Sequence, residues 1–197
     1  MIHIICLARQ NSSRLPNKIF SDINGKMAIE WVIDKLLLTK APFSFAIPSS
    51  DATGDLGLFL RRKNIKFFSG DEDDVLSRFV GAAHQVSEKF VQRYNCDNLL
   101  VHPDYIRACH QLVKNRQEEL IFSNTMWENH NGQSVEIIQK NVCNIGEKPS
   151  QFEEEHVFPY FYNRLKPVVK LPKPIGRLGP LDTLKDLDRI KKHLSLS

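Results

Sequence analysis

The fold of this chain is decided by its opening stretch, Ile2–Lys18, which reads IHIICLARQNSSRLPNK. The first part, Ile2–Leu7, is apolar and rich in β-branched residues, and this pattern predicts a strand that is buried on both faces. The second part, Ala8–Lys18, is polar and contains Asn, Ser and Pro, which predict a loop. Open parallel sheets bind their ligands beyond the carboxyl ends of the strands, so we expect the site near this loop.

Further strands and helices are predicted to alternate as far as Asn124. The expected strands are Phe43–Ile47, Ile65–Phe68, Lys89–Arg93 and Leu120–Phe122. Apolar residues spaced three and four apart predict the helices, around Ile29–Leu37, Leu56–Leu60, Leu76–Ala83 and Ile106–Val113. After Asn124 the pattern is less regular, and it predicts a strand at Val135–Ile138 and helices at Glu153–Tyr162 and Thr183–His193. This order predicts an α/β fold with a doubly wound, mostly parallel sheet in a single domain, residues 1–197.

The composition limits the classes of function. The 197 residues are 42% hydrophobic and 25% charged, as in a globular protein, and the net charge of +4 favours anionic ligands only weakly. No apolar run approaches the roughly 18 residues of a membrane span, and Ile2–Ala8 is too short for a signal peptide. Four cysteines without CxxC spacing are expected to be reduced thiols of a cytoplasmic protein. Basic residues are spread along the chain without interleaved aromatics, so nucleic-acid binding is not expected.

The loop Ala8–Lys18 is the main candidate for a binding site. Three cations, Arg9, Arg14 and Lys18, lie within it together with the hydroxyls of Ser12 and Ser13. Arginine presents a planar fork to phosphate oxygens and lysine a compact charge, so the loop suits an anion. Both the Walker A and the GxGxxG glycine patterns are missing from it. On the residues alone, a solvated basic surface loop is an equally good interpretation.

Acidic residues offer two kinds of metal site. Asp97 follows the predicted strand Lys89–Arg93, and Asp182 precedes the last predicted helix; each could hold Mg²⁺ or simply cap a turn or helix. The cluster Asp71–Asp74 begins a predicted helix, where carboxylates favour the positive end of the dipole, but it could also be the metal-binding DxD of a nucleotide-sugar glycosyltransferase. A zinc site is not expected from the remaining candidates, because their spacing fits no standard pattern; these are Cys96, His102, Cys109 and His110.

The loop signature, Ala8-Arg9-x-x-Ser12-x-Arg14-Leu15-Pro16-x-Lys18, resembles that of the cytidylyltransferases. These include the acylneuraminate and 3-deoxy-manno-octulosonate cytidylyltransferases, and the spore-coat polysaccharide biosynthesis type is the most similar. Further similar segments follow in order: Asn24–Lys26, Gly70, Asp74–Phe79, Arg93–Pro103, Gly132–Glu136, Glu155–Tyr160 and Arg177–Leu187. The resemblance covers nearly the whole chain and implies a Rossmann-like nucleotidyltransferase fold, related to the glycosyltransferase-A type.

The resemblance also implies an activity: Mg²⁺-dependent transfer of CMP from CTP to a sugar or sugar acid, with release of pyrophosphate, for surface polysaccharide or glycan biosynthesis. Arg9, Lys18 and Asp97 would be catalytic, and Asp97 and Asp182 would hold the metal ion. The residues implied to bind the nucleotide are Leu7, Ala8, Arg9, Asn11, Ser12, Arg14, Lys18, Ser49, Asp51 and Arg78. Arg78 could instead pair with the acidic cluster. Arg93, Glu136 and His156 are candidates for the acceptor side, although Glu136 could be a surface charge at a strand edge.

The chain departs from the family pattern at three positions. Cys96 replaces a Gly and Leu99 a Pro beside the metal aspartate, and Glu154 replaces a common Arg on the sugar side. The resemblance implies a homodimer, with residues of about 124–170 forming a less regular acceptor-side or dimer region. Three alternatives stay open: a glycosyltransferase that uses Asp71 and Asp73, a nucleotidyltransferase with another nucleotide or a phosphorylated acceptor, and a non-catalytic nucleotide-binding homologue.

Overall fold

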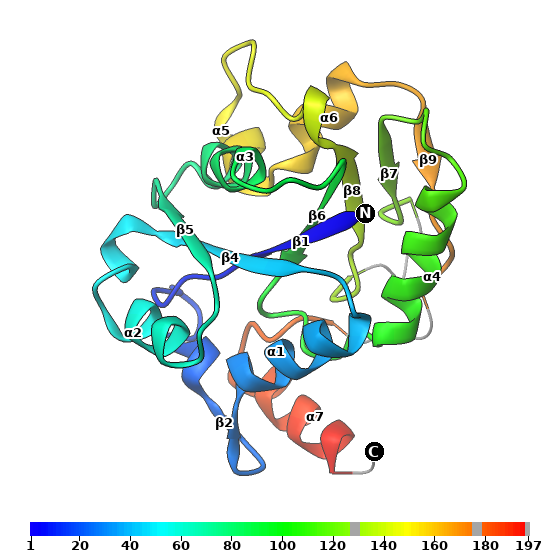
Figure 1. The fold of residues 1–197 in the computed structure, drawn as a ribbon. Coiled ribbons are helices and arrows are strands. Elements are labelled where there is room, and N and C mark those ends of the chain that lie inside the picture. The colour runs from blue at the N-terminus through cyan, green and yellow to red at the C-terminus, as the bar shows by residue number, and fades with distance from the viewer. Residues whose placement is uncertain (127–130, 175–178, 196–197) are drawn as a thin grey trace.

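A mixed, mostly parallel sheet organises the molecule (Figure 1). The structure is a computed structural model that describes residues 1–126, 131–174 and 179–195. Within these ranges the main sheet has seven strands in the order β5-β4-β1-β6-β8-β7-β9. Their bounds are β1 Ile2–Leu7, β4 Phe43–Pro48, β5 Phe67–Gly70, β6 Phe90–Asn95, β7 Ile121–Ser123, β8 Glu136–Gln139 and β9 Val168–Lys170. The predicted fold class is therefore confirmed, with β1 near the middle of the sheet.

The chain direction changes at a single strand of this sheet. β1 pairs in parallel with β4 and with β6, β4 with β5, and β7 with β9. β8 alone runs antiparallel, to β6 on one side and to β7 on the other. Winding from β1 outward through β4 and β5, and then back across β1 to β6, creates a switch point between β1 and β6. Ligands of such sheets bind beyond the carboxyl ends of the strands at that point.

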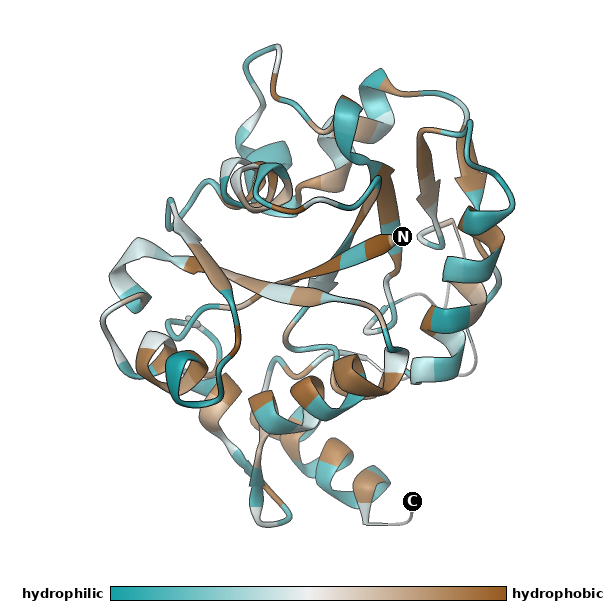
Figure 2. Cartoon of the chain, in the orientation of Figure 1, coloured by the Kyte–Doolittle hydropathy of each residue, from teal (hydrophilic) through white to brown (hydrophobic). Residues whose placement is uncertain are grey.

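Helices cover both faces of the sheet. One face carries α1 Ala28–Thr39, α2 Asp55–Arg62, α4 Pro103–Lys114 and α7 Leu184–Leu194; the other carries α3 Val75–His84, α5 Gln151–His156 and α6 Phe158–Arg164 (Figure 1). Alternate residues of β1 feed the two cores, because successive strand side chains point to opposite faces: Ile4 and Cys6 join the first, Ile5 and Leu7 the second. In Figure 2 hydrophobic residues, coloured brown, recur along both β1 and α1.

Several boundaries differ from the sequence prediction. The strand expected at Ile65–Phe68 begins at Phe67, and β6 continues through Asn95. The single helix expected at Glu153–Tyr162 is divided into α5 and α6 by Val157, whose φ of 65° lies in the left-handed region. A small hairpin formed by β2 (Asp22–Ile23) and β3 (Lys26–Met27) turns at Asn24 and Gly25, both at positive φ as in an Asn-Gly turn of type I′.

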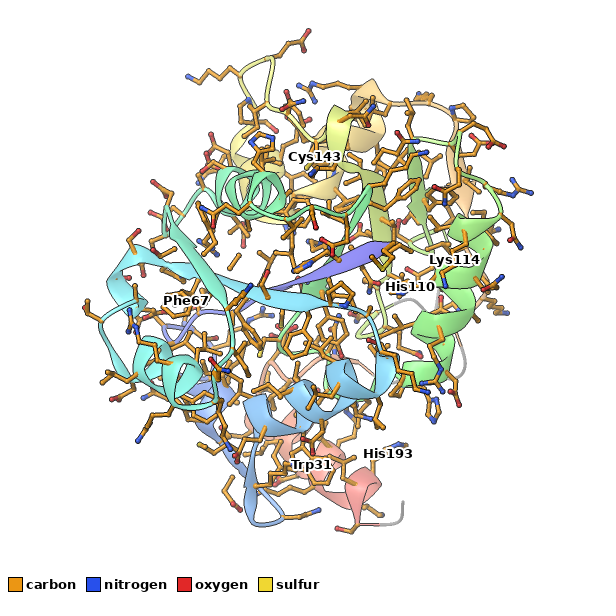
Figure 3. The ribbon with its side chains drawn as sticks, in the orientation of Figure 1. Trp31, Phe67, His110, Lys114, Cys143 and His193 are labelled. Carbon is orange, nitrogen blue, oxygen red and sulfur yellow. The ribbon has the colours of Figure 1, made fainter. Side chains whose placement is uncertain are left out.

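Short elements complete the described chain. They are the 3₁₀ turns η1 Lys18–Phe20, η2 Ser49–Asp51 and η3 Lys140–Val142. The β2–β3 hairpin is fastened to α1 by Trp31, whose ring nitrogen donates to the carbonyl oxygen of Ile23 at 3.0 Å; Figure 3 shows this indole on α1 beside the hairpin. None of the helices described is both long and apolar enough to cross a membrane.

Candidate active site

The loop after β1 forms one wall of a pocket at the switch point. Buried β1 ends at Leu7, and the chain then runs through a mostly polar, partly exposed loop until η1 turns Lys18 inward, where it is 9% exposed. β6, α3 and α5 supply the other walls. The lining residues are Leu7, Ala8, Arg9, Ser12, Ser13, Arg14, Lys18, Ile19, Val75, Arg78, Arg93, Asn95, Cys96, Asp97, Glu155 and His156. Five cations therefore face a pocket with two carboxylates among its lining residues.

Lys18 joins the two aspartates that the sequence placed far apart. Its Nζ lies 2.7 Å from Oδ2 of Asp97 and 3.0 Å from Oδ1 of Asp182. Asp97 stands two residues beyond β6, and Asp182 stands just before Thr183, the N-cap of α7. The two segments are also tied by their backbones, because the amide of Leu181 donates to the carbonyl oxygen of Asp97 at 2.9 Å. The three side chains thus form one cluster at the carboxyl end of the sheet.

The Lys18 ammonium stays charged in this cluster. Burial opposes its charge, but the two carboxylates of Asp97 and Asp182 outweigh that effect and raise the pKa of Lys18 above its ordinary value. Arg14 adds a second cation at the solvent side, with Nη1 3.2 Å from Oδ2 of Asp182. The aspartates are therefore neutralised by cations from the loop, and a ligand that binds here has to rearrange these ion pairs.

Arg78 lies both at the pocket and against the acidic cluster, and its contact with a nucleotide stays a prediction. It lines the pocket at only 2% exposure, and it also donates through Nη1 to the backbone carbonyls of Asp71 and Glu72. Its Nε has no hydrogen-bond partner among the described residues. Burial, and then the charge of nearby Arg9, lower the pKa of Arg78. Within the described part of the chain, neither Arg9 nor Arg78 has a carboxylate in ion-pair contact, and both line the pocket, so an anion would be stabilised between them.

The acidic cluster Asp71–Asp74 forms the beginning of α3. Oδ1 of Asp71 accepts hydrogen bonds from the amides of Asp73 and Asp74, each at 2.9 Å, and these bonds lower the pKa of Asp71. Asp74 is the N-cap, since its Oδ1 accepts from the amide of Ser77 at 2.8 Å. The carboxylates therefore satisfy backbone donors that the first helical turn leaves free, which is the helix-start role expected from the sequence.

The acceptor-side candidates divide between pocket and interior. Arg93 and His156 line the pocket, whereas Glu136 is 2% exposed in β8 and is absent from the lining. Glu136 instead receives Nε of Arg93 at 2.7 Å on Oε2 and the hydroxyl of Tyr162 at 2.6 Å on Oε1. The interpretation of Glu136 as a surface charge is wrong, because β8 lies between β6 and β7 rather than at an edge.

Three residues predicted to border the nucleotide lie outside this lining. Asp51 is buried, and its Oδ2 accepts from the amide of Gln10 at 2.8 Å, so it holds the loop after β1. Ser49 donates to the carbonyl oxygen of Gly70 at 2.9 Å, and Asn11 is exposed. Lining residues that the sequence analysis did not assign are Ser13, Ile19, Val75, Asn95, Cys96 and Glu155. Most of them are next to a predicted site residue in the sequence, and this proximity is the signal from which they could have been predicted.

The donor set suits a hard divalent cation. Asp97 and Asp182 offer carboxylate oxygens, the ligands that Mg²⁺ prefers, and Mg²⁺ usually keeps several waters beside one or two carboxylates. Among the described residues there is no group of three or more His, Cys, Asp or Glu side chains placed to hold a metal ion. The remaining ligands would therefore come from substrate oxygens and water. The zinc candidates do not converge: His110 faces Gln92, and Cys96 lies against Cys6.

The three residues that depart from the family pattern lie in different surroundings. Leu99 is fully buried, and Cys96 is 3% exposed with its amide donating to the carbonyl oxygen of Leu7 at 3.0 Å. Glu154 is half-buried on α5 and is absent from the pocket lining. Arg177 and Leu178, which belong to the last similar segment, lie outside the described residues.

Comparisons with known proteins identify a family and a fold for this chain. A family model described as Cytidylyltransferase matches residues 3–181. An uncharacterized protein of Methanocaldococcus jannaschii is 26% identical over 211 residues, which cover 98% of this chain and 84% of that protein. A 3-deoxy-manno-octulosonate cytidylyltransferase of Colwellia psychrerythraea is 47% identical over 38 residues, 19% of this chain and 14% of the relative. A solved cytidylyltransferase structure from Leptospira borgpetersenii has the same fold, with a TM-score of 0.87 and 19% identity over 100% of this chain and 87% of the other.

Proposed function

The chain belongs to the cytidylyltransferase family, and from this premise we propose that it transfers CMP from CTP to a sugar or sugar acid with release of pyrophosphate. The observation that carries the proposal is the cluster in which Lys18 contacts both Asp97 and Asp182, beside the cationic loop after β1. Membership makes the chain a nucleotidyltransferase. The acceptor, the metal ion and the role in polysaccharide or glycan biosynthesis belong to the proposal.

The phosphates of CTP are assigned to the cations of the loop and of α3. Arg9, Arg14 and Lys18 come from the loop and η1, while Arg78 lines the pocket from α3. The acceptor oxygen has to approach an α-phosphorus that is shielded by negative oxygens, and charge develops on the departing pyrophosphate. Fixed cations in a partly water-excluded pocket stabilise that charge in the transition state. Ser12 and the loop amides add neutral donors.

The metal ion is assigned to Asp97 and Asp182. Both are carboxylates, they converge on one cation in the structure, and Mg²⁺ accepts such a pair. When bound, Mg²⁺ supplies charge neutralisation for phosphate oxygens and polarisation of the acceptor oxygen. Lys18 is close enough to both aspartates to exchange its contacts with them for contacts to a phosphate. Holding the reactants in line then contributes much of the remaining acceleration.

The acceptor is assigned to the side of the pocket formed by β6 and α5. Arg93 and His156 line this side, and Glu155 adds a carboxylate. The homodimer implied by the family resemblance stays a prediction, as does a closer relation to the spore-coat polysaccharide type. A glycosyltransferase that uses Asp71 and Asp73 is disfavoured, because Asp71 is occupied by two backbone amides at the beginning of α3.

A pyrophosphate-release screen tests the proposal. The four ribonucleoside triphosphates are each combined with Mg²⁺ and a panel of sugars, sugar acids and sugar phosphates. We expect CTP with one class of acceptor to release pyrophosphate. Asp97→Asn should nearly abolish this release and leave the melting temperature close to that of the wild type. Asp188→Asn, at an exposed position of α7, is the matched control and should turn over normally.

Three outcomes would contradict the proposal. Near-normal turnover of Asp97→Asn would remove Asp97 from the metal site. If no combination of nucleotide and acceptor releases pyrophosphate, the chain would be a nucleotide-binding homologue without this activity. Consumption of UDP- or GDP-sugars without pyrophosphate would favour the glycosyltransferase alternative.

A further inference from the structure

Two cations of the loop after β1 are paired with both aspartates of the proposed metal site. Nζ of Lys18 lies 2.7 Å from Oδ2 of Asp97 and 3.0 Å from Oδ1 of Asp182. Nη1 of Arg14 lies 3.2 Å from the other oxygen of Asp182, Oδ2. Three of the four carboxylate oxygens are thus in contact with a cation from one loop. The two cations and the two carboxylates carry equal and opposite charge, so the cluster is electrically balanced by the protein itself.

The two aspartates are joined by contacts that do not involve Lys18. The amide of Leu181 donates to the carbonyl oxygen of Asp97 at 2.9 Å, and Asp182 is the next residue along the chain. Asp182 also precedes Thr183, the N-cap of α7. Backbone hydrogen bonding and a helix cap therefore keep the two carboxylates together, and we expect the pair to stay assembled when the lysine changes its partner.

Lys18 reaches the cluster from a backbone that is fixed separately. In η1 the amide of Lys18 donates to the carbonyl oxygen of Leu15 at 3.2 Å, and the amide of Ser21 donates to that of Lys18 at 3.2 Å. Neighbouring Ile19 is buried in the core. Lysine carries its charge on a flexible four-carbon stem, and Lys18 and Asp97 both line the pocket. Lys18 can therefore exchange a carboxylate for a phosphate by rotating its side chain, without opening of the loop.

Charge balance makes the binding of a metal ion and that of a triphosphate depend on each other. Lys18 and Arg14 oppose a divalent cation that enters alone, because they compete for the carboxylates and leave an excess of positive charge in a partly buried cluster. A triphosphate that enters alone draws Lys18 away, which leaves carboxylates unpaired beside the negative phosphate oxygens. When both enter, Lys18 pairs with phosphate, the carboxylates pair with the metal ion, and each charge has a partner.

We propose that Lys18 and Arg14 are resident counter-ions of Asp97 and Asp182, so that the site binds a divalent cation together with the triphosphate and binds the free cation only weakly. This inference rests on the proposed function, and it defines the substrate as the metal complex of the nucleotide. Such coupling is reciprocal: the metal ion raises the affinity for CTP by the same factor as CTP raises the affinity for the metal ion. Lys18 contributes to this factor because it is the group that changes its partner.

Binding of Mn²⁺ without nucleotide tests the inference and needs no turnover. Mn²⁺ suits the same carboxylate and water ligands as Mg²⁺, and its free concentration is measured by electron paramagnetic resonance. Lys18→Met should bind Mn²⁺ about tenfold more tightly than wild type, because a charge-assisted contact no longer competes for the carboxylates. Arg14→Gln should give a smaller increase, since this side chain is 66% exposed and contacts only Asp182. Lys63→Met is the matched control, because Lys63 also pairs with a carboxylate but lies outside the pocket, and it should match wild type.

Calorimetric titration with CTP, in Mg²⁺ and in EDTA, measures the coupling from the nucleotide side. Wild type should bind CTP about tenfold more tightly in Mg²⁺. Lys18→Met should reduce this ratio, because the lysine gives its full phosphate contact only where the carboxylates no longer hold it. The substitution thus strengthens binding of the free metal ion and weakens binding of CTP, whereas loss of a purely structural contact would weaken both.

A double variant locates the effect at the carboxylates. Lys18→Met combined with Asp97→Asn should bind Mn²⁺ no more tightly than wild type. Tighter Mn²⁺ binding that survives in this double variant would overturn the inference, as would unchanged or weaker Mn²⁺ binding by folded Lys18→Met. An unchanged ratio of CTP affinities in Mg²⁺ and EDTA would do the same. Melting temperatures show which variants are folded. If Lys18→Met does not fold, exposed Arg14→Gln decides, and unchanged Mn²⁺ affinity in that variant contradicts the counter-ion role.

The outcomes separate this inference from the proposed function. If the metal and CTP affinities change as expected but no combination of nucleotide and acceptor releases pyrophosphate, the transfer reaction fails and the counter-ion role of Lys18 stands. If wild type releases pyrophosphate but removal of Lys18 does not strengthen binding of free Mn²⁺, only the inference fails.

Discussion

At the scale of single residues, Lys18 has the most demanding position. Its Nζ contacts two carboxylates, which stabilise an ammonium whose charge burial alone would disfavour. Lys18→Met keeps the apolar stem and removes the charge, so we expect CTP to bind at least about tenfold more weakly, as for other lost charge-assisted contacts. Calorimetric titration with CTP measures this. Lys63→Met is the control, because exposed Lys63 pairs with Glu30 at 2.8 Å away from the pocket. Unchanged CTP affinity in Lys18→Met would instead favour the interpretation of the loop as a solvated basic surface loop without a role in binding.

Residue identity alone could not decide between roles for several of these side chains. Arg78 was equally consistent with a nucleotide contact and with a partner of the acidic cluster. In the structure it lines the pocket and contacts that cluster through backbone carbonyls rather than carboxylates, while the nucleotide contact stays a prediction. For Glu136 the deciding fact was the antiparallel insertion of β8 beside β6. Such a pairing depends on which strands become neighbours, and local sequence pattern carries no information about that.

At the scale of elements, α7 positions Asp182, the second aspartate of the proposed metal site. Thr183 caps this helix in a capping box: its Oγ1 accepts from the amide of Asp186, and Oδ2 of Asp186 accepts from the amide of Thr183 at 2.9 Å and from that of Asp182 at 3.3 Å. Thr183→Ala should cost about 1 kcal/mol of stability and raise the Mg²⁺ concentration needed for half-maximal turnover, because Asp182 loses its fixed neighbour. Urea unfolding and a Mg²⁺ titration check the two effects. Thr183→Ser retains the cap and should resemble wild type. If Thr183→Ala is less stable but has an unchanged Mg²⁺ dependence, the cap has a structural role only.

Elements with a clear period were predictable, and elements set by context were not. β1 and the apolar face of α1 carry their own signals, since every residue of Ile2–Leu7 is buried and the apolar side chains of α1 recur at helical spacing. The break at Val157 is different, because a β-branched residue at positive φ is locally unfavourable and is maintained only by its surroundings. Strand β9 is also set by its context, because it has only three residues and depends on its pairing with β7.

At the scale of the molecule, the site is a product of topology. Lys18, Asp97 and Asp182 are separated by most of the chain, yet the doubly wound order brings the end of β1, the end of β6 and the beginning of α7 to one crevice. The general location was predictable, because parallel strands of this fold direct their carboxyl ends to a common edge. The Arg93–Glu136–Tyr162 row was not, since it requires the register of β6 with β8 and the placement of α6 over them.

The stability of the whole molecule should depend on pH through His110, which lies on α4 beside Lys114 (Figure 3). The ring is 7% exposed, with Nε2 2.5 Å from Oε1 of Gln92; burial, and then the charge of Lys114, lower its pKa to about 4. The unfolded chain, with an ordinary histidine pKa near 6.5, takes up this proton first, so stability is complete above about pH 6.5 and falls as the pH decreases toward 4. About 2 kcal/mol should be lost by pH 5. Urea unfolding of wild type and of His110→Gln at pH 7.5 and at pH 5 measures this loss of stability. The variant keeps an amide donor for Gln92, and its free energy of unfolding should fall by correspondingly less between the two pH values. Other groups, including buried His3, titrate alike in both proteins and do not affect the comparison. Equal losses in the two proteins would show that the His110 ring accepts its proton without unfolding.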